Sequence, residues 1–246
     1  MKDTTLPLVI NALARGVGYD LLAQCFAHPD TDCVAALRVA ANDALAVEGW
    51  VPMLRLAAIA REVPIDHLEP VWVSLITFSG SPDCPAFETA YFGSDAQQQT
   101  QRMADIAGFY RAFGVDATST GVRPDDLPVE LEFMAYLCRK EAYAAEHLGA
   151  PRVAQAQRAQ RLFLSEHLGR WGAVFGRNLA AAAPGGHFYA LAAETLAIWI
   201  DRECAALGVT PDEIHGPIPP WTPPISHGPE FAGRAAIVPM DDIAVR

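Results

Sequence analysis

The chain has 246 residues, of which 51% are hydrophobic and 19% are charged, so the sequence excludes a wholly disordered protein and predicts a large core. Its 18 Lys and Arg are outnumbered by 29 Asp and Glu, which gives a formal net charge of −11. This charge repels phosphate backbones and anionic lipids, so we expect no nucleic acid as a partner. A cationic peptide is compatible with it.

The termini and the cysteines predict a cytoplasmic protein. The first residues contain one Lys and an acidic Asp3, which is unlike a secretory leader. No run of about eighteen apolar residues is free of charge, Pro or Gly, so we predict no membrane span. The cysteines are odd in number and lack a CxxC pair, which favours reduced thiols. They are Cys25, Cys33, Cys84, Cys138 and Cys204.

Apolar residues recur at spacings of three and four in alanine-rich segments, without the alternation of strands, and this pattern predicts an all-α fold. We expect a single bundle of about eight helices within residues 1–208. The predicted helices cover 5–27, 31–47, 51–62, 66–78, 95–113, 126–147, 151–175 and 186–207. Residues 209–246 are rich in Pro, which predicts an extended C-terminal tail.

Two predicted connections are longer than the others, at residues 78–95 and 115–126. Loops of this length in a helical domain are functional or mobile. The first contains Phe87, Tyr91 and Phe92 around Glu88, which together offer stacking surfaces beside a carboxylate. Both connections are therefore candidates for a binding site.

Motifs of common enzymes are missing from the sequence. It contains no GxSxG, GxxxxGK[ST] or HExxH, and no GxGxxG after a strand. Cys25, His28 and Cys33 offer metal-ligand types, but Pro29 interrupts them and no second cluster completes the set. We therefore predict no catalytic residue, no metal site and no cofactor.

Histidines precede Leu-Gly twice, at His147 and His167. The C-terminal end of a helix favours a cation, so we interpret both as residues at helix ends.

The helix predicted over 126–147 combines an apolar stripe with acidic residues. At 100° per residue, Leu127, Leu131 and Met134 share one face, and Glu130 and Glu141 fall on the same side. Two interpretations stay open. In the first, Asp125 or Asp126 caps the helix and each glutamate meets a nearby Arg.

In the second interpretation, the carboxylates form the rim of an apolar groove that binds a peptide alternating arginines with aliphatic residues. Asp125, Asp126 and Glu130 would receive arginines, and Tyr91 would stack. Arg123 would hold the loop through a carboxylate or carbonyl. The predicted peptide-binding residues are Glu88, Tyr91, Arg123, Pro124, Asp125, Asp126 and Glu130, with Trp72 as a further wall of the groove.

Three runs resemble a known family: CPAFETAYFG at 84–93, QQQTQRMADIAGFYRAFGV at 97–115 and RPDDLPVELEFMAYLCRKEAYA at 123–144. They are similar to the TorD/DmsD/NarJ molybdoenzyme maturation chaperones, and within these to the chaperones of type II dimethyl sulfoxide reductase family enzymes. The resemblance covers about residues 60–175. In the family a His usually follows the Pro-Asp pair, whereas here Asp126 follows Pro124 and Asp125. A role of that imidazole is therefore not carried over, and the acidity is greater.

The resemblance implies an all-helical, non-catalytic cytoplasmic protein. It would bind the precursor of a molybdoenzyme catalytic subunit, often through the twin-arginine signal peptide, until the molybdenum cofactor is inserted before export. Two alternatives stay open on the residues alone. One is a helical adaptor unrelated to molybdoenzymes, and the other is an enzyme with a helical pocket that uses Glu130 or Glu141 as acid and base.

Overall fold

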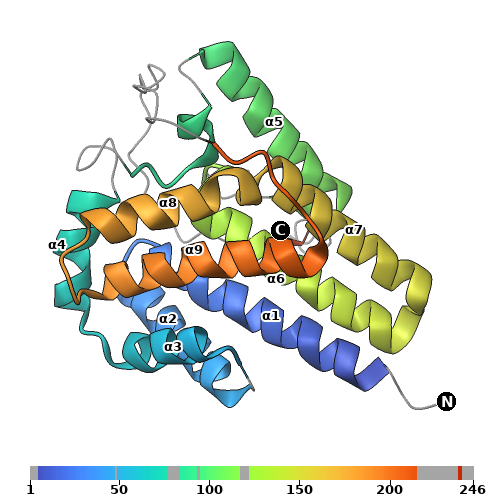
Figure 1. Cartoon of the computed structure of the whole chain (residues 1–246), viewed down its shortest axis with the longest axis horizontal. Coiled ribbons are helices and arrows are strands. Elements are labelled where there is room, and N and C mark those ends of the chain that lie inside the picture. Colours follow the sequence, from blue (N-terminus) through green and yellow to red (C-terminus); the bar gives the residue numbers. More distant parts are fainter. Residues whose placement is uncertain are drawn as a thin grey trace, which may run out of the picture.

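The computed structural model describes residues 5–47, 49–76, 84–92, 95–116, 122–214 and 238–239. Within these ranges the chain forms nine α-helices and one two-residue strand pair, so the predicted all-α fold is confirmed (Figure 1). The helices are α1 Thr5–Phe26, α2 Thr31–Ala46, α3 Val51–Glu62, α4 Ile65–Leu75, α5 Ala96–Ala112, α6 Leu127–Tyr143, α7 Ala150–Glu166, α8 Leu168–Ala182 and α9 Phe188–Leu207.

One predicted helix, 151–175, is wrong, because the chain breaks at His167 into α7 and α8. The cause lies two residues further on. A Cβ atom at Gly169 would lie 2.2 Å from the carbonyl oxygen of Leu164, so this close turn of the backbone excludes any side chain there. The break places His167 between two helices, which matters for the site described below.

The other His-Leu-Gly sequence also ends a helix. α6 runs into a single π turn over Ala144–Leu148, and Gly149 follows with a φ of 82°. This left-handed backbone favours glycine and starts the turn into α7.

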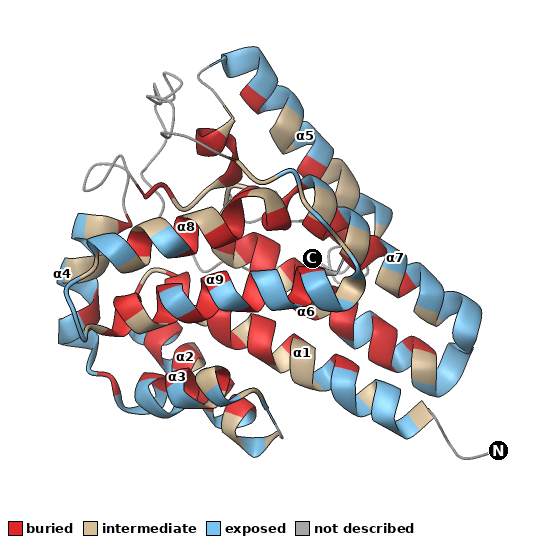
Figure 2. Ribbon diagram, viewed as in Figure 1, coloured by how far each residue is buried: buried red, intermediate tan, exposed pale blue. Residues whose placement is uncertain are grey.

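The bundle is built around pairs of helices that approach closely. α1 packs mainly along α6, and α8 packs along α9 (Figure 1). A Cβ atom at Gly176 would lie 2.7 Å from the carbonyl oxygen of Ala193, so α8 and α9 touch through their backbones. α6 is buried nearly all round rather than along one stripe, because α1, α7 and α8 each cover part of it (Figure 2).

By length and composition α1 could cross a membrane, and it is the one helix in the described ranges that qualifies. Its most apolar window has a mean hydropathy of 1.2 and is 39% buried. The core helix of a globular protein meets the same criteria, and the second half of α1, from Gly16 to Phe26, is mostly buried against its neighbours (Figure 2).

The described part of the C-terminal tail has two pieces. Residues 209–214 continue from the end of α9 and contact α8, where the Ile214 amide donates to the Arg170 carbonyl at 3.1 Å. Strand β2, Val238–Pro239, pairs antiparallel with β1, Val115–Asp116, directly after α5. The remainder of the tail predicted over 209–246 lies outside the described residues.

Candidate functional site

The two long connections predicted from the sequence meet each other in the structure. Residues 84–92 contain a short 3-10 turn, Glu88–Tyr91, and they lie antiparallel to residues 122–127. The Glu88 amide donates to the Asp125 carbonyl, and the Leu127 amide donates to the Ala86 carbonyl, both at 2.9 Å. These bonds hold the charged and aromatic residues of both connections near the start of α6.

Asp125 is fully buried, and both oxygens of its carboxylate accept hydrogen bonds. Arg123 donates to its two carboxylate oxygens from Nε at 3.0 Å and from Nη2 at 2.9 Å. The Thr89 amide and hydroxyl donate at 3.1 and 2.7 Å. Arg123 also stacks on the Phe87 ring, with its Cζ atom 4.4 Å from the ring centre. The expectation that Arg123 holds the loop through a carboxylate is confirmed.

Glu88 is also fully buried. Its Oε1 accepts from Arg102 and its Oε2 contacts His167 Nδ1, both at 3.1 Å. Arg102 stacks on the Phe92 ring, with Cζ 3.4 Å from the ring centre. His167 was predicted only as a residue at a helix end. The structure adds that its ring is buried against Glu88.

Glu130 lies in the first turn of α6 and is completely buried. Trp171 Nε1 donates to its Oε2 at 3.2 Å, while Oε1 has no hydrogen-bond partner among the described residues. Burial, and then the nearby carboxylates of Glu88 and Asp125, raise the pKa of Glu130 well above its usual value. Glu130 meets Trp171 rather than the Arg expected in the first interpretation of the sequence.

Asp126 occupies the N-cap position of α6, but its side chain makes no capping hydrogen bond. The predicted capping role of the two aspartates is therefore wrong: Asp125 turns inward to Arg123 and Thr89. The Asp126 side chain is 23% exposed, and its nearest cation is Arg123 at 3.9 Å. Partial burial, with the neighbouring Asp125 carboxylate, raises the pKa of Asp126 to about 8, although Arg123 opposes the shift.

The remaining predicted residues have separate places. Tyr91 is buried against Trp171, with ring centres 5.2 Å apart, so it is covered rather than open to a peptide. The Pro124 carbonyl accepts from the Tyr110 hydroxyl at 2.7 Å. Trp72 donates to the Phe26 carbonyl at 3.3 Å, and this bond joins α4 to the end of α1.

We call the charged group at the start of α6 the loop cluster; it consists of Glu88, Arg102, Arg123, Asp125, Asp126, Glu130 and His167. Its carboxylates were predicted to lie open at the rim of a groove. That exposure is wrong for Glu88, Asp125 and Glu130, which are fully buried. Arginines that are themselves partly exposed cover Glu88 and Asp125. Whether these residues bind a peptide stays a prediction.

A second buried charged group, which the sequence analysis missed, joins four helices. We call it the Arg15 cluster, and it consists of Arg15, Glu141, Gln160 and Glu203. Arg15 contacts Glu141 at 3.2 Å and Glu203 at 2.7 Å, and it donates to Gln160 Oε1 at 2.6 Å. The available signal was a single arginine in the middle of an otherwise uncharged apolar stretch, residues 5–19. Glu141 thus meets an Arg, as the first interpretation expected.

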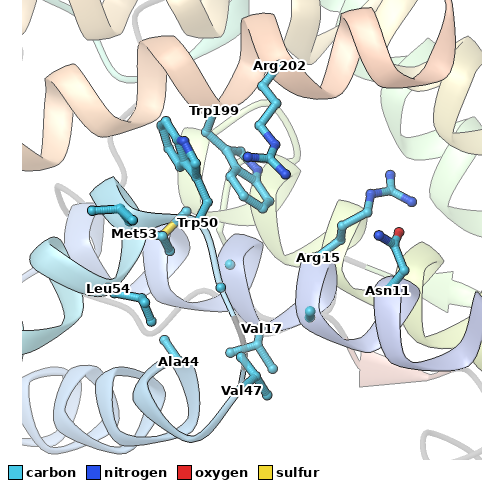
Figure 3. Close-up of a pocket in the computed structure, with 14 residues that line it drawn as sticks. Asn11, Arg15, Val17, Ala44, Val47, Trp50, Met53, Leu54, Trp199 and Arg202 are labelled. Atoms are coloured by element: carbon cyan, nitrogen blue, oxygen red, sulfur yellow. The ribbon is translucent and has the colours of Figure 1, made fainter. Parts of the chain in front are cut away.

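A pocket of about 390 Å³ lies where α1, α3 and α9 meet (Figure 3). Trp50, Trp199 and Met53 form apolar parts of its wall, Arg202 lies beside the two tryptophans, and Arg15 lies near Asn11 on α1. Arg202 stacks over the Trp50 ring at 5.6 Å. None of the peptide-binding residues predicted from the sequence lines this pocket. In the described ranges, no three His, Cys, Asp or Glu side chains gather as potential metal ligands, and the five cysteines are buried and form no disulfide with one another.

Comparison with known proteins gives consistent matches. The model of the nitrate reductase delta subunit family matches residues 37–177, a range that contains both segments of the loop cluster. The chain is 30% identical over 179 residues to the perchlorate reductase assembly chaperone protein of Dechloromonas aromatica (strain RCB), covering 69% of this chain and 79% of that protein.

Two further relatives have similar names. The chlorate reductase assembly chaperone protein of Ideonella dechloratans is 29% identical over 209 residues, covering 84% of this chain and 96% of that protein. The selenate reductase assembly chaperone protein of Thauera selenatis is 27% identical over 177 residues, covering 71% and 81%. The matched regions thus span most of each relative.

Proposed function

The chain belongs to the nitrate reductase delta subunit family, and on that basis we propose that it is the assembly chaperone of a molybdoenzyme catalytic subunit. The relatives are assembly chaperones rather than enzymes. In this proposal the chain binds the immature subunit in the cytoplasm through its twin-arginine signal peptide, and it assists insertion of the molybdenum cofactor before export. The observation that carries the proposal is the family match across the loop cluster.

The chemistry of the loop cluster supports a partner that carries arginines. A guanidinium group is best recognised by a carboxylate that accepts two N–H bonds together with an aromatic ring for stacking. The structure provides this combination in full with Asp125 beside Phe87, and with a single N–H bond at Glu88 beside Phe92. The acidic net charge of the chain also favours association with a cationic segment.

The alternative of an enzyme that uses Glu130 or Glu141 as acid and base would gain support from a closed cavity lined by both carboxylates and a histidine. In the described structure their contacts separate them, since Glu130 bonds to Trp171 in the loop cluster and Glu141 bonds to Arg15 in the other cluster. The alternative of an unrelated helical adaptor lacks support from the relatives, all of which are named for reductase assembly.

Titration of a synthetic signal peptide tests the proposal. The peptide carries two consecutive arginines followed by an apolar run, and calorimetry compares wild type with the Asp125→Asn/Asp126→Asn pair. Loss of a charged hydrogen bond predicts binding that is weaker by about 1–3 kcal/mol. An Asp43→Asn/Asp66→Asn pair, which changes two exposed carboxylates on α2 and α4, is the matched control and should bind as wild type does.

Equal affinity of wild type and the Asp125/Asp126 pair would remove the site assignment but leave the chaperone role. That role is tested separately by deleting the gene and measuring the molybdenum cofactor content of the reductase. A reductase that is fully loaded without the chaperone would contradict the role itself.

A further inference from the structure

We propose that Arg102 and Arg123 are internal stand-ins for the two arginines of the partner peptide, and that the peptide's guanidinium groups replace them when it binds. This inference rests on the proposed function and adds a regulation of the same site. The carboxylates are held closed by the protein's own arginines until a partner with better-placed arginines competes for them.

Arg102 and Arg123 each contact a buried carboxylate and an aromatic ring. Arg123 donates two bonds to Asp125 at 3.0 and 2.9 Å and lies on Phe87. Arg102 donates to Glu88 at 3.1 Å and lies on Phe92. Each guanidinium therefore has one buried carboxylate and one ring of the 84–92 segment, which is how an arginine of a bound peptide would be recognised.

The two arginines cover the two buried carboxylates on the side that faces solvent. The Glu88 and Asp125 side chains are 0% exposed, whereas the side chains of Arg102 and Arg123 are 28% and 17% exposed. The arginines thus lie between the carboxylates and solvent. In this proposal, rotation of these long side chains uncovers the carboxylates without unfolding a helix, and Arg123 gives up its bonds to Asp125 and Thr89.

The carboxylates of Glu88 and Asp125 belong to segments that are bonded to each other. The Glu88 amide bonds to the Asp125 carbonyl, so the two residues lie opposite each other on antiparallel segments. Thr89, the residue after Glu88, donates its amide and hydroxyl hydrogens to the Asp125 carboxylate, so this carboxylate lies beside the Glu88 segment. Two neighbouring arginines of one peptide can therefore reach both carboxylates at once.

The charge balance of the loop cluster favours replacement of its two arginines over the addition of two further cations. Burial raises the pKa of Glu130 and of Asp126, which favours their neutral forms, while Arg102 and Arg123 pair with Glu88 and Asp125. Exchange leaves this balance unchanged. The other groups that face the cluster are His167, Arg170 and Tyr110. If two more cations were added beside them, Glu130 and Asp126 would have to lose their protons to balance the charge.

The first experiment measures the affinity of the twin-arginine peptide for Arg102→Gln and Arg123→Gln. Both variants should bind at least about threefold more tightly than wild type, since no internal competitor has to leave. Arg177→Gln removes an exposed arginine of α8, which pairs with Glu213 and with Asp201 of α9, and should bind as wild type does. A peptide with two lysines should gain less, because an ammonium group cannot fork onto a carboxylate.

The possible results separate the exchange from the proposed function. If wild type binds and the two variants bind equally or more weakly, the exchange is overturned while signal-peptide binding stands. Binding that appears only in the variants supports the exchange. If wild type and both variants all fail to bind, both the exchange and the proposed peptide site are overturned.

A second experiment needs no peptide and guards against a folding defect. Millimolar methylguanidinium should raise the melting temperature of Arg102→Ala above its value in an equal concentration of KCl, because the small cation refills the space beside Glu88 and Phe92. Wild type, whose site is occupied, should show no such difference. Absence of this rescue in Arg102→Ala would show that the site does not accept an external guanidinium, and would overturn the exchange.

Discussion

The two buried charged groups of this protein use the same residue types to different ends. In the Arg15 cluster one arginine from α1 binds glutamates from α6 and α9 and a glutamine from α7. Gln160 and Gln157 complete the hydrogen bonds of Glu141. In the loop cluster two arginines each bind a carboxylate, one carboxyl oxygen of Glu130 has no described partner, and Asp126 is partly exposed.

The arginines of the two clusters differ in how many segments each one joins, and we expect this number to decide whether the loss of an arginine disrupts the bundle. Arg15 is shared by three helices besides its own, so its departure would break several contacts in the bundle at once. Arg102 and Arg123 each contact a neighbouring segment and a surface-facing ring, so their departure leaves the helices in place. We therefore expect the pairs of Arg15 to be structural, and the proposed exchange requires that the pairs of Arg102 and Arg123 can separate.

The largest expected effect is in the Arg15 cluster. Arg15→Met leaves the carboxylates of Glu141 and Glu203 buried without a cation, and breaking a buried pair in this way costs about 3–5 kcal/mol. Denaturation by urea, followed by circular dichroism, measures this loss. Adding Glu203→Gln to the variant should recover part of the stability, because one of the two uncompensated charges is removed.

A loss below about 1 kcal/mol in Arg15→Met would contradict the structural role and erase the contrast between the clusters. Arg102→Met is the matched comparison, since it also removes one guanidinium from a buried glutamate. We expect it to cost less than Arg15→Met, because Arg102 is more exposed and His167 stays beside Glu88.

A smaller effect, with a pH signature, is expected at Asp126. Its pKa is raised from 3.8 to about 8 in the folded state by burial. Between these values the unfolded chain releases the proton while the folded protein keeps it, so stability falls as pH rises and levels off above about pH 8. Asp126→Asn removes this penalty and should be more stable than wild type by about 1–2 kcal/mol at pH 8.

Urea denaturation at pH 4, 6 and 8 tests this expectation. The advantage of Asp126→Asn should be absent near pH 4 and grow toward pH 8. Asp43→Asn, at an exposed position on α2, should show no such growth. An advantage that is constant with pH would mean that the carboxyl group titrates normally, and the loop cluster would then carry more negative charge than the exchange allows.

Much of the fold followed from local signals in the sequence. Asp30 caps α2 by accepting from the Cys33 amide at 2.8 Å, and Gly208 ends α9 with a φ of 66°. Such signals act within a few residues and are therefore visible in the chain. The break at His167 was signalled by the His-Leu-Gly sequence, but the apolar periodicity of residues 151–175 continues through it and predicted a single helix; the Leu164 carbonyl lies close to Gly169 at this break.

The candidate site shows the same limit. The Arg123–Asp125 pair joins residues two positions apart, and the sequence analysis anticipated that Arg123 holds the loop. Glu88 is covered by Arg102 and His167, which are 14 and 79 residues away, so its burial depends on how α5 and the junction of α7 and α8 pack. Sequence patterns identified the acids and rings that gather, but not the arginine and histidine side chains that cover them.

The smallest effect is expected for the exposed pair of Arg139 and Asp20, which joins the same two helices, α6 and α1, as Arg15 does on the inside. The Arg139 side chain is 50% exposed, and partial burial raises the pKa of Asp20 despite the nearby guanidinium. The pair therefore gains little, and Arg139→Gln should cost less than about 1 kcal/mol, a cost that 0.5 M NaCl reduces further. Urea denaturation at low and high salt measures both quantities. A loss comparable to that of Arg15→Met would mean that ion pairs between α1 and α6 stabilise the bundle regardless of burial, and that the position of an arginine within the core does not distinguish the two clusters.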